Sequence, residues 1–297
     1  MPGNPAETVL SRFSGPVTPQ QLAAIKAQFG LSNAGVLAQY GDYLRDVAHG
    51  DLGISITYFP EKVSTVIGAA LPWTVILLGV STVIGFALGT LLGVFFGWRR
   101  GGRLDWLLPV GSFFSSVPYF WIALLALTVF GADLHWFPLS GGYADDLHPG
   151  WTGAFVISAV WHSVLPASTI VICALAGWVL GMRNMMVSVL SDDYVLVAEA
   201  KGLPRRRVVF GYAARNALLP NVASFALALG FIVGGSIVVE EVFSYPGIGF
   251  LLFNAVGNSD YPLMEGIFLV ITLMVLAANL LADVCYVLLD PRTRAQR

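Results

Sequence analysis

Apolar residues gather in five long runs along this chain, and charged residues stand almost entirely between the runs. Crossing the hydrocarbon core of a bilayer takes roughly 20 apolar residues in a helix, so each run predicts one membrane-spanning helix. The expected fold class is therefore an all-α, polytopic membrane protein with about five membrane-spanning helices. The runs cover residues 73–97, 106–131, 164–182, 217–239 and 266–289.

Composition agrees with this pattern. Hydrophobic residues make up 56% of the 297 residues and charged residues 11%, and the mean hydropathy is +0.74, whereas soluble domains carry about 45–50% apolar and roughly 25% charged residues. The net charge of −2 argues against a nucleic-acid partner, which needs a basic surface. Cys173 and Cys285 both fall inside apolar runs, where two inert thiols are expected rather than a disulfide.

The segments between the runs alternate in charge. Lys and Arg exceed Asp and Glu in 98–105, in 183–216 and in the tail 290–297, whereas 132–163 and 240–265 contain acidic residues and no Lys or Arg. An excess of basic residues marks the cytoplasmic side of a membrane protein. The C-terminus is therefore expected in the cytoplasm, and 183–216 is the longest cytoplasmic loop.

This topology divides the chain into an external N-terminal segment, 1–72, a transmembrane domain, 73–289, and a short cytoplasmic tail, 290–297. The N-terminal segment has no apolar stretch that could carry it across the membrane, so we expect a further spanning helix before Met1. Within this segment, Thr18-Pro-Gln-Gln carries the capping signals of a helix that ends near residue 30. A second helix is expected from about 34 to 48.

Small residues recur at every fourth position of the first run: Ser81, Gly85, Gly89, Gly93 and Gly97. A stripe of this kind lets two helix backbones approach closely, and we favour helix packing over a smooth pore wall. A second group of small residues, within 230–236, precedes Glu240 and Glu241, and here the lining of a pore is favoured. Asp283 is the one ionisable residue deep in a run; because it lies near the cytoplasmic end, a structural role is favoured over proton coupling.

Motifs for catalysis and for metal binding are absent from the sequence. It contains no phosphate-binding loop and no H-E-x-x-H, C-x-x-C or G-x-S-x-G pattern. The polar residues of 145–148 are expected to form a loop rather than a metal site. We therefore expect that the chain is not an enzyme and binds no cofactor or metal directly.

The loop 183–216 carries helix signals that its basic charge alone does not explain. Asp192 and Asp193 suit a helix N-terminus, Gly202 suits a helix C-cap, and Pro204 can open a second short helix. A short helix held between two membrane spans is suited to docking onto another protein. A helix that lies on the lipid surface is the alternative.

Several motifs resemble one known family. Glu199-Ala-Lys-Gly202 and Arg215-Asn-Ala-Leu-Leu-Pro220 resemble the EAA loop of ABC importer permeases. The oligopeptide/dipeptide/nickel branch of these permeases is similar over essentially the whole chain. The motifs that carry this likeness are Pro2-Gly-Asn-Pro5, Gly50-Asp-Leu-Gly-Ile-Ser55, Val239-Glu-Glu-Val-Phe-Ser-Tyr-Pro-Gly-Ile-Gly249, Asp260-Tyr-Pro262 and the ending Asp283 … Leu289-Asp-Pro-Arg292.

The resemblance implies the transmembrane subunit of a type I importer in the cell membrane. Its expected partners are a second related permease, two ATPase subunits that hydrolyse ATP with Mg²⁺, an external solute-binding protein and the lipid bilayer. The expected substrates are di- and oligopeptides, with nickel or an oligosaccharide as alternatives within the family. A secondary transporter or channel is the alternative from another class, but it would need ion-coupling carboxylates at mid-membrane, whereas Asp283 is peripheral.

By the same resemblance, the loop is a coupling helix that fits a groove on an ATPase subunit. The residues expected to make this contact are Tyr194, Ala198, Glu199, Ala200, Lys201, Gly202, Arg205, Arg206 and Arg207. A second group is expected at the external mouth of the transport pathway: Gly234, Gly235, Glu240, Glu241, Phe243, Pro246 and Gly247.

Overall fold

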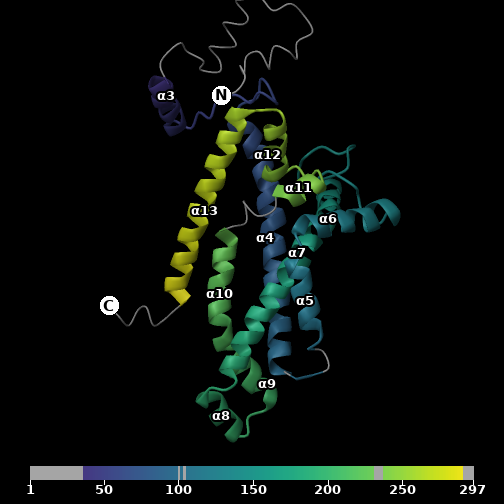
Figure 1. Cartoon of the computed structure of the whole chain (residues 1–297), viewed down its shortest axis with the longest axis vertical. Helices are drawn as coiled ribbons and strands as arrows, with labels where there is room; N and C mark the ends of the chain where they lie inside the picture. Colours follow the sequence, from purple (N-terminus) through teal and green to yellow (C-terminus); the bar gives the residue numbers. More distant parts are fainter. Residues whose placement is uncertain (1–35, 100, 103–104, 231–236, 290–297) are drawn as a thin grey trace, which may run out of the picture.

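The computed structural model describes residues 36–99, 101–102, 105–230 and 237–289. Figure 1 shows α4, α7, α10 and α13 along the long axis, with α8 and α9 at one end (the α8 end) and α3 and α12 towards the other (the α3 end). The helices are α3 Val36–Ala48, α4 Val63–Trp98, α5 Leu107–Ser116, α6 Tyr119–Ala126, α7 Gly153–Val189, α8 Asp193–Ala200, α9 Arg205–Arg207, α10 Arg215–Gly230, α11 Ile237–Val242, α12 Ile248–Gly257 and α13 Tyr261–Leu289, with π-helical segments at Leu127–Asp133 and Val208–Ala214.

Three helices of the described ranges are long and apolar enough to cross a membrane: α4, α7 and the Tyr261–Leu280 part of α13. The bent pair of α5 and α6 would make a fourth. These helices confirm the expected all-α polytopic membrane fold, and α3 confirms the helix expected at 34–48. The expected span 217–239 coincides in part with α10, but residues 231–236, with Gly234 and Gly235, lie outside the described residues, as does the helix expected at 18–30.

The first spanning helix begins earlier than its apolar run predicts. α4 starts at Val63 instead of residue 73 and has 36 residues, which is about 54 Å at 1.5 Å per residue and well beyond the ~30 Å hydrocarbon core. The helix therefore extends ten residues before the apolar run that begins at residue 73. The helix continues through Pro72, although a proline removes one helical hydrogen bond, because its first turns are buried in an apolar cluster with α12 and α13.

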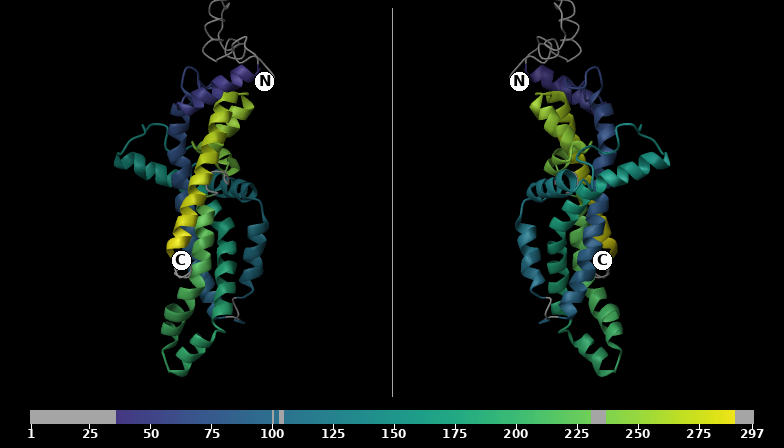
Figure 2. Two further views of the ribbon diagram at one scale, coloured as in Figure 1. Left: turned by 90° about the vertical axis from the view of Figure 1, so that its left-hand side faces the viewer. Right: turned by 90° about the vertical axis from the view of Figure 1, so that its right-hand side faces the viewer.

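The second apolar run does not form one straight span. Its two helical parts meet at an angle of 96°, and Figure 2 shows α6 running across the long axis from the end of α5. The break falls at Val117, whose ψ of 131° is extended. The residue before a proline avoids the helical region, so Pro118 explains the break, and the expectation of a single continuous helix over 106–131 was wrong.

The glycine stripe of α4 lies against α7. A Cβ added at Gly93 would lie 2.5 Å from Met182 Cβ, and one added at Gly97 would lie 2.5 Å from Met186 Cβ. Gly89 is similarly closed off by Trp178. These approaches leave no room for any side chain, so the packing role expected for the stripe is confirmed. The interface continues towards α10, where Phe225 stacks on Phe86 at 4.3 Å between ring centroids.

At the α3 end, a buried carboxylate ties an extended loop to α13. Asp260, which has no exposed surface, precedes α13 and accepts the N–H of Leu263 at 3.2 Å, as an N-cap residue does. Its other oxygen accepts the hydroxyl of Ser55 at 2.5 Å and the N–H of Thr57 at 2.7 Å. Two of the segments noted in the sequence, 50–55 and 260–262, are thus joined through one side chain.

We predict that Gly93→Leu weakens the contact between α4 and α7. The new side chain would overlap Met182 and the backbone oxygen of Val179, and overpacking of this kind costs about 1–3 kcal/mol. Thermal unfolding of the detergent-purified protein should show a lower midpoint. Gly79→Leu is the matched control, because a Cβ at Gly79 meets nothing within 4 Å; equal midpoints for the two variants would contradict the interface.

We also predict that Asp260→Ala loosens the loop 50–62. The change leaves up to three donors without their acceptor, at about 1–3 kcal/mol for each one that stays buried. Limited trypsin cleavage after the exposed Lys62 should become faster. Glu265→Ala, at an exposed position one turn into the same helix, should leave that rate unchanged, and a rate unaffected by Asp260→Ala would show that the carboxylate does not hold the loop.

Candidate docking site for a partner protein

The segment from α8 to α10 forms the extreme tip of the molecule (Figure 1). It leaves the bundle at the end of α7 and returns to it at the start of α10. α7 continues to Val189, so the first residues of the expected loop 183–216 are the last turns of a long helix. The loop is therefore shorter and better anchored than its charge pattern predicts.

Local signals define α8 as the sequence predicts. Asp192 has an extended backbone and precedes the helix, and Asp193 lies in its first turn. At the other end Gly202 has a φ of +72°, which costs glycine little, and its N–H donates to the carbonyl of Glu199 at 2.8 Å. Pro204 then precedes the short helix α9. The helix start, the glycine C-cap and the second helix are confirmed.

One face of α8 is fixed to the rest of the chain. Val195 and Ala198 are buried against Val208. The amide of Asn216, in the first turn of α10, donates to the Tyr194 hydroxyl at 2.9 Å. Ala198 is only 2% exposed, so the expectation that its side chain contacts a partner was wrong. Its side chain lies on the inner face of α8 and holds the helix in place.

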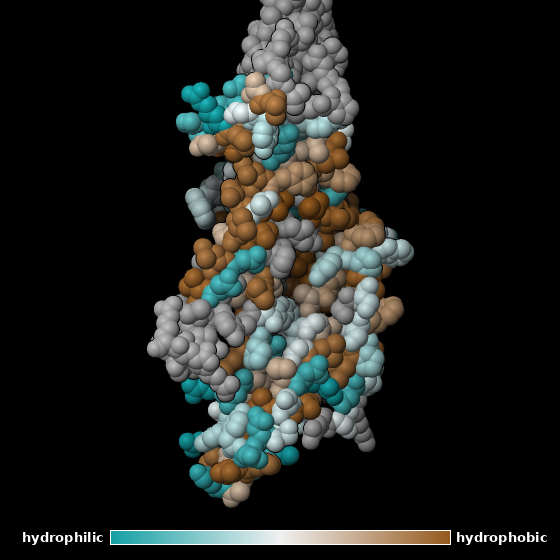
Figure 3. All heavy atoms as spheres, turned by 60° about the vertical axis from the view of Figure 1, so that its left-hand side comes forward, coloured by the Kyte–Doolittle hydropathy of each residue, from teal (hydrophilic) through white to brown (hydrophobic). Residues whose placement is uncertain are grey.

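The opposite face of α8 is open and apolar. Leu196 and Val197 are 51% and 52% exposed, and Phe210 nearby in sequence is 56% exposed. The other expected contact residues are all exposed: Tyr194, Glu199, Ala200, Lys201, Gly202, Arg205, Arg206 and Arg207. Figure 3 shows brown apolar atoms among teal polar ones at this tip. The arrangement, with apolar side chains ringed by charges, is typical of a protein-docking surface.

The sequence places Leu196 and Val197 within the stretch expected to make the contact, 194–202, but does not single them out, and Phe210 lies outside that stretch. A signal was present, because Asp193–Ala200 reads DYVLVAEA and is apolar around most of its circumference. A short helix at a polar tip can bury only one such face within its own chain. The other face is then left for a partner.

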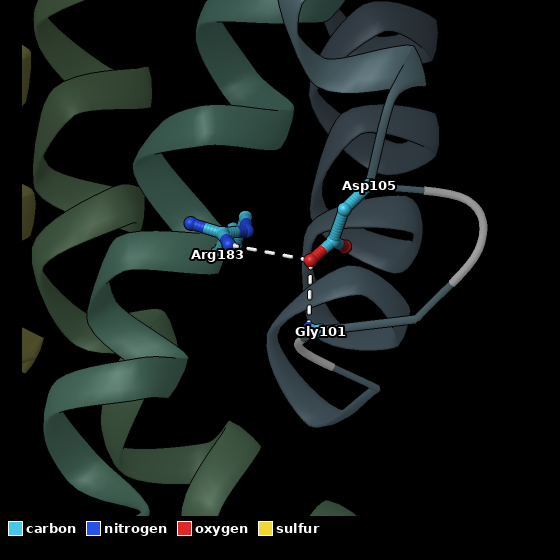
Figure 4. A network of polar contacts seen from close by, with 3 residues as sticks. All are labelled: Gly101, Asp105 and Arg183. Atoms are coloured by element: carbon cyan, nitrogen blue, oxygen red, sulfur yellow. Dashed lines mark hydrogen bonds and ion pairs between the residues drawn. The ribbon is translucent and has the colours of Figure 1, made fainter.

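A polar network holds the neighbouring loop beside this tip (Figure 4). Arg183 of α7 lies 3.9 Å from a carboxylate oxygen of Asp105, and that oxygen also accepts the N–H of Gly101 at 2.7 Å. Arg205 of α9 lies over the ring of Trp98, 6.0 Å from its centroid. The end of α4, the following loop and α9 thus meet on one side of α7.

The residues expected at an external pathway mouth lie towards the α3 end, and part of this group is enclosed. Glu240 has no exposed surface, and its carboxylate accepts the N–H of Gly249 at 2.7 Å at the start of α12. The hydroxyl of Thr74, in α4, accepts the N–H of the preceding residue, Ile248, at 2.7 Å. Phe243 and Gly247 are also buried. The hydrogen bonds that Glu240 and Thr74 accept hold the segment together.

Glu241 and Pro246 keep partly exposed surface, so they are the described members of this group that can still reach an opening. Gly234 and Gly235 lie outside the described residues. Asp283 is exposed on α13. Among the residues that the structure describes, no group of three or more His, Cys, Asp or Glu residues is placed to hold a metal ion.

Comparison with known proteins adds independent findings. Residues 89–295 match the family described as binding-protein-dependent transport system inner membrane component. The oligopeptide transport system permease protein AppB of Bacillus subtilis is 34% identical over 255 residues, 86% of this chain and 79% of AppB. The di/tripeptide transport system permease protein DppB of Pseudomonas aeruginosa is 36% identical over 313 residues, 100% of this chain and 91% of that protein. The dipeptide transport system permease protein DppB of Alkalihalophilus pseudofirmus is 30% identical, covering 99% and 91% respectively.

We predict that Tyr194→Phe loosens α8 without unfolding the bundle. The change removes the hydrogen bond from Asn216, which is worth about 0.5–1.5 kcal/mol and less at this exposed position. Hydrogen exchange of the α8 amides should become faster by up to about tenfold, while exchange in α4 and α7 stays the same. Tyr212→Phe, in the same loop, is the control; identical exchange in both variants would show that the bond does not order α8.

Proposed function

The chain belongs to the binding-protein-dependent transport system inner membrane components, and we propose that it is a permease subunit of an ATP-driven importer of di- and oligopeptides. Family membership makes it a multi-pass transport subunit of the inner membrane. The peptide substrate is proposed because the three relatives described above are all named for the transport of oligopeptides or dipeptides.

The α8 tip is the surface on which an ATPase subunit docks. The observation that carries this proposal is the two-faced packing of α8: Val195 and Ala198 are locked into the chain, while Leu196 and Val197 are open to a partner. An apolar patch at a charged, water-exposed tip gains free energy when a groove covers it. Arg205–Arg207 add basic charge beside it, which favours an acidic rim on the partner.

If ATPase subunits dock at the α8 tip, that end of the chain lies on the cytoplasmic side of the membrane. The α8 end, with Arg99, Arg183 and the basic residues of α9, faces the cytoplasm, and α13 descends to that end, so that the C-terminal tail is cytoplasmic. The α3 end faces outward, where a solute-binding protein delivers the peptide. A second related permease completes the pathway. ATP and Mg²⁺ bind to two ATPase subunits, and this chain contributes the coupling contact.

We predict that Leu196→Asp and Val197→Asp each disrupt ATPase binding. An unpaired carboxylate would be buried in an apolar contact, at a cost of several kcal/mol, and 1.4 kcal/mol already weakens binding about tenfold. The ATPase recovered with the tagged permease from detergent-solubilised membranes should fall by more than about tenfold, and peptide uptake should fall with it.

Leu196→Met is the matched control and should retain both ATPase and uptake, because it keeps an apolar side chain of similar size. Both aspartate variants should keep the thermal midpoint of the parent permease, since the replaced side chains are half-exposed. An aspartate variant that holds its ATPase and transports peptide normally would rule out docking through this face.

A further inference from the structure

A long connection without helix or strand lies beside α11 (Figure 1). The π-helical segment ends at Asp133 and α7 begins at Gly153, which leaves 19 residues, 134–152 (the strap), between them. Connections longer than about 12–15 residues with no secondary structure of their own are uncommon in compact domains and usually serve a function. The docking of a partner at the α8 end gives the strap no role.

The strap lies directly on residues 243–247. Gly141 of the strap donates its N–H to the carbonyl of Phe243 at 3.0 Å. A Cβ added at Gly142 would lie 2.8 Å from both Cγ and Cδ of Pro246, so the strap backbone contacts the proline ring. Pro246 is one of the two described residues of the expected pathway mouth that keep exposed surface. An opening beside Pro246 can therefore widen only if the strap and 243–247 separate.

Trp73 of α4 contacts both sides of this junction. Its ring stacks on Tyr143 of the strap at 5.8 Å between ring centroids and meets the edge of Tyr245 at 5.6 Å. The next residue, Thr74, accepts the N–H of Ile248, which ties the 243–247 side to α4. Trp73 is thus the side chain through which α4 holds the strap against 243–247.

The strap is anchored on its other side to the first part of α7. The N–H of Ala144 donates to the hydroxyl of Ser158 at 2.9 Å, and the ring of Tyr143 lies 5.2 Å from that of Phe155. Figure 2 shows this part of α7 turned away from the long axis. The close contacts between the glycines of α4 and α7 all lie beyond Pro166. The strap and the first part of α7 therefore form a unit that the glycine contact does not hold.

The contacts that join this unit to α4 and 243–247 are ring contacts and single hydrogen bonds. Besides the bond from Gly141, the hydroxyls of Ser163 and Tyr245 lie 3.0 Å apart, and the ring of Phe155 lies 6.1 Å from that of Trp73. Residues 243–247 carry no charged side chain, so no ion pair fixes them to the strap. Contacts of this kind can separate and form again in each transport cycle.

We propose that the strap is a latch on the outer mouth of the permease. Seated on 243–247 and held there by Trp73, it keeps the mouth closed, and it must lift from this segment for each peptide that enters. This inference rests on the proposed function of peptide import.

A disulfide across the latch tests the proposal. The full-length permease, in cells that also make its partner subunits, carries Cys173→Ala and Cys285→Ala, and then Gly142→Cys with Pro246→Cys. The Cβ of residue 246 is one bond from Cγ, so it lies at most about 4.3 Å from a Cβ at position 142, within the range of about 3.5–4.5 Å that a disulfide requires. Replacing Pro246 also removes the ring atoms that the new Cβ would overlap.

Gly85→Cys with Ala174→Cys, in the same background, is the matched control. A Cβ at Gly85 lies 3.9 Å from the Cβ of Ala174, so this pair also has disulfide geometry. It joins α4 to α7 in the region where the glycine stripe already holds the two helices together. A disulfide there should leave transport unchanged.

Both variants are oxidised with copper–phenanthroline, the disulfides are verified by non-reducing mass spectrometry, and uptake of radiolabelled trialanine is measured. The 142/246 variant should lose uptake on oxidation and recover it on reduction with dithiothreitol, whereas the 85/174 variant should transport in both states. A verified 142/246 disulfide with normal uptake would overturn the latch, as would equal loss of uptake in both variants. So would a 142/246 pair that forms no disulfide while the 85/174 pair forms one.

The role of Trp73 is measured in the same 142/246 background. Trp73→Ala should slow formation of the disulfide, because it removes the ring that holds the two sides together, whereas Trp73→Phe keeps a ring there and should stay close to the parent rate. Equal rates in all three proteins would contradict this role. A parent permease that takes up no trialanine would count against peptide import itself, whereas a parent that imports it together with a locked variant that also does would count against the latch alone.

Discussion

The close approach of α4 and α7 is the constraint on which the rest of the structure depends. Gly89, Gly93 and Gly97 have no side chains, so the backbone of α4 lies directly against side-chain stems of α7. Lipid is as apolar as leucine and gives helices no hydrophobic reason to associate, which leaves tight packing as a main attraction between them. The contact fixes both the rotation and the axial register of α7. Everything attached to α7 takes its position from that register.

Two attachments show this dependence. Arg183 reaches Asp105 only because the register places it level with the loop that follows α4. One residue earlier, Met182 is buried under Gly93 and its sulfur accepts the amide of Asn221 at 2.9 Å, which positions α10. The ion pair itself contributes little, about 0–1 kcal/mol for a partly exposed pair. It reports the arrangement of the helices rather than causing it.

The sequence predicted those features that depend on local pattern. The four-residue repeat of glycines is a property of one helix, so its packing role could be inferred without knowing that Trp178, Met182 and Met186 lie opposite. Hydropathy could not tell which proline interrupts the second run. Pro109 falls in the first turn of α5, where its missing N–H costs nothing, whereas Pro118 forces Val117 out of the helical region.

The candidate site, too, could be predicted from the sequence only in part. Motif likeness located α8, but likeness selects residues by identity, and the orientation of each side chain depends on the docking of α8 against Val208. Ala198 therefore belongs to the inner face, while the unremarked Leu196 and Val197 lie on the outer face. Glu240 gives a second example. An acidic pair before a loop suggested a pathway mouth, yet the donor that satisfies Glu240 is a backbone N–H at the start of α12, which no local pattern indicates.

These contacts also give a physical route from the proposed ATPase contact to the opposite end of the permease. The part of α7 that packs against α4, from Pro166 to Val189, is about 36 Å long, and its contact with the glycines of α4 makes α4 move with it. α4 in turn holds the start of α12 through Thr74, and α12 holds α11 through Glu240. A tilt of about 5° in a rod of this length moves its far end by about 3 Å. A displacement of α8 can therefore reach the segment around Glu241 through packed helices and a few hydrogen bonds, without a separate hinge at the α3 end.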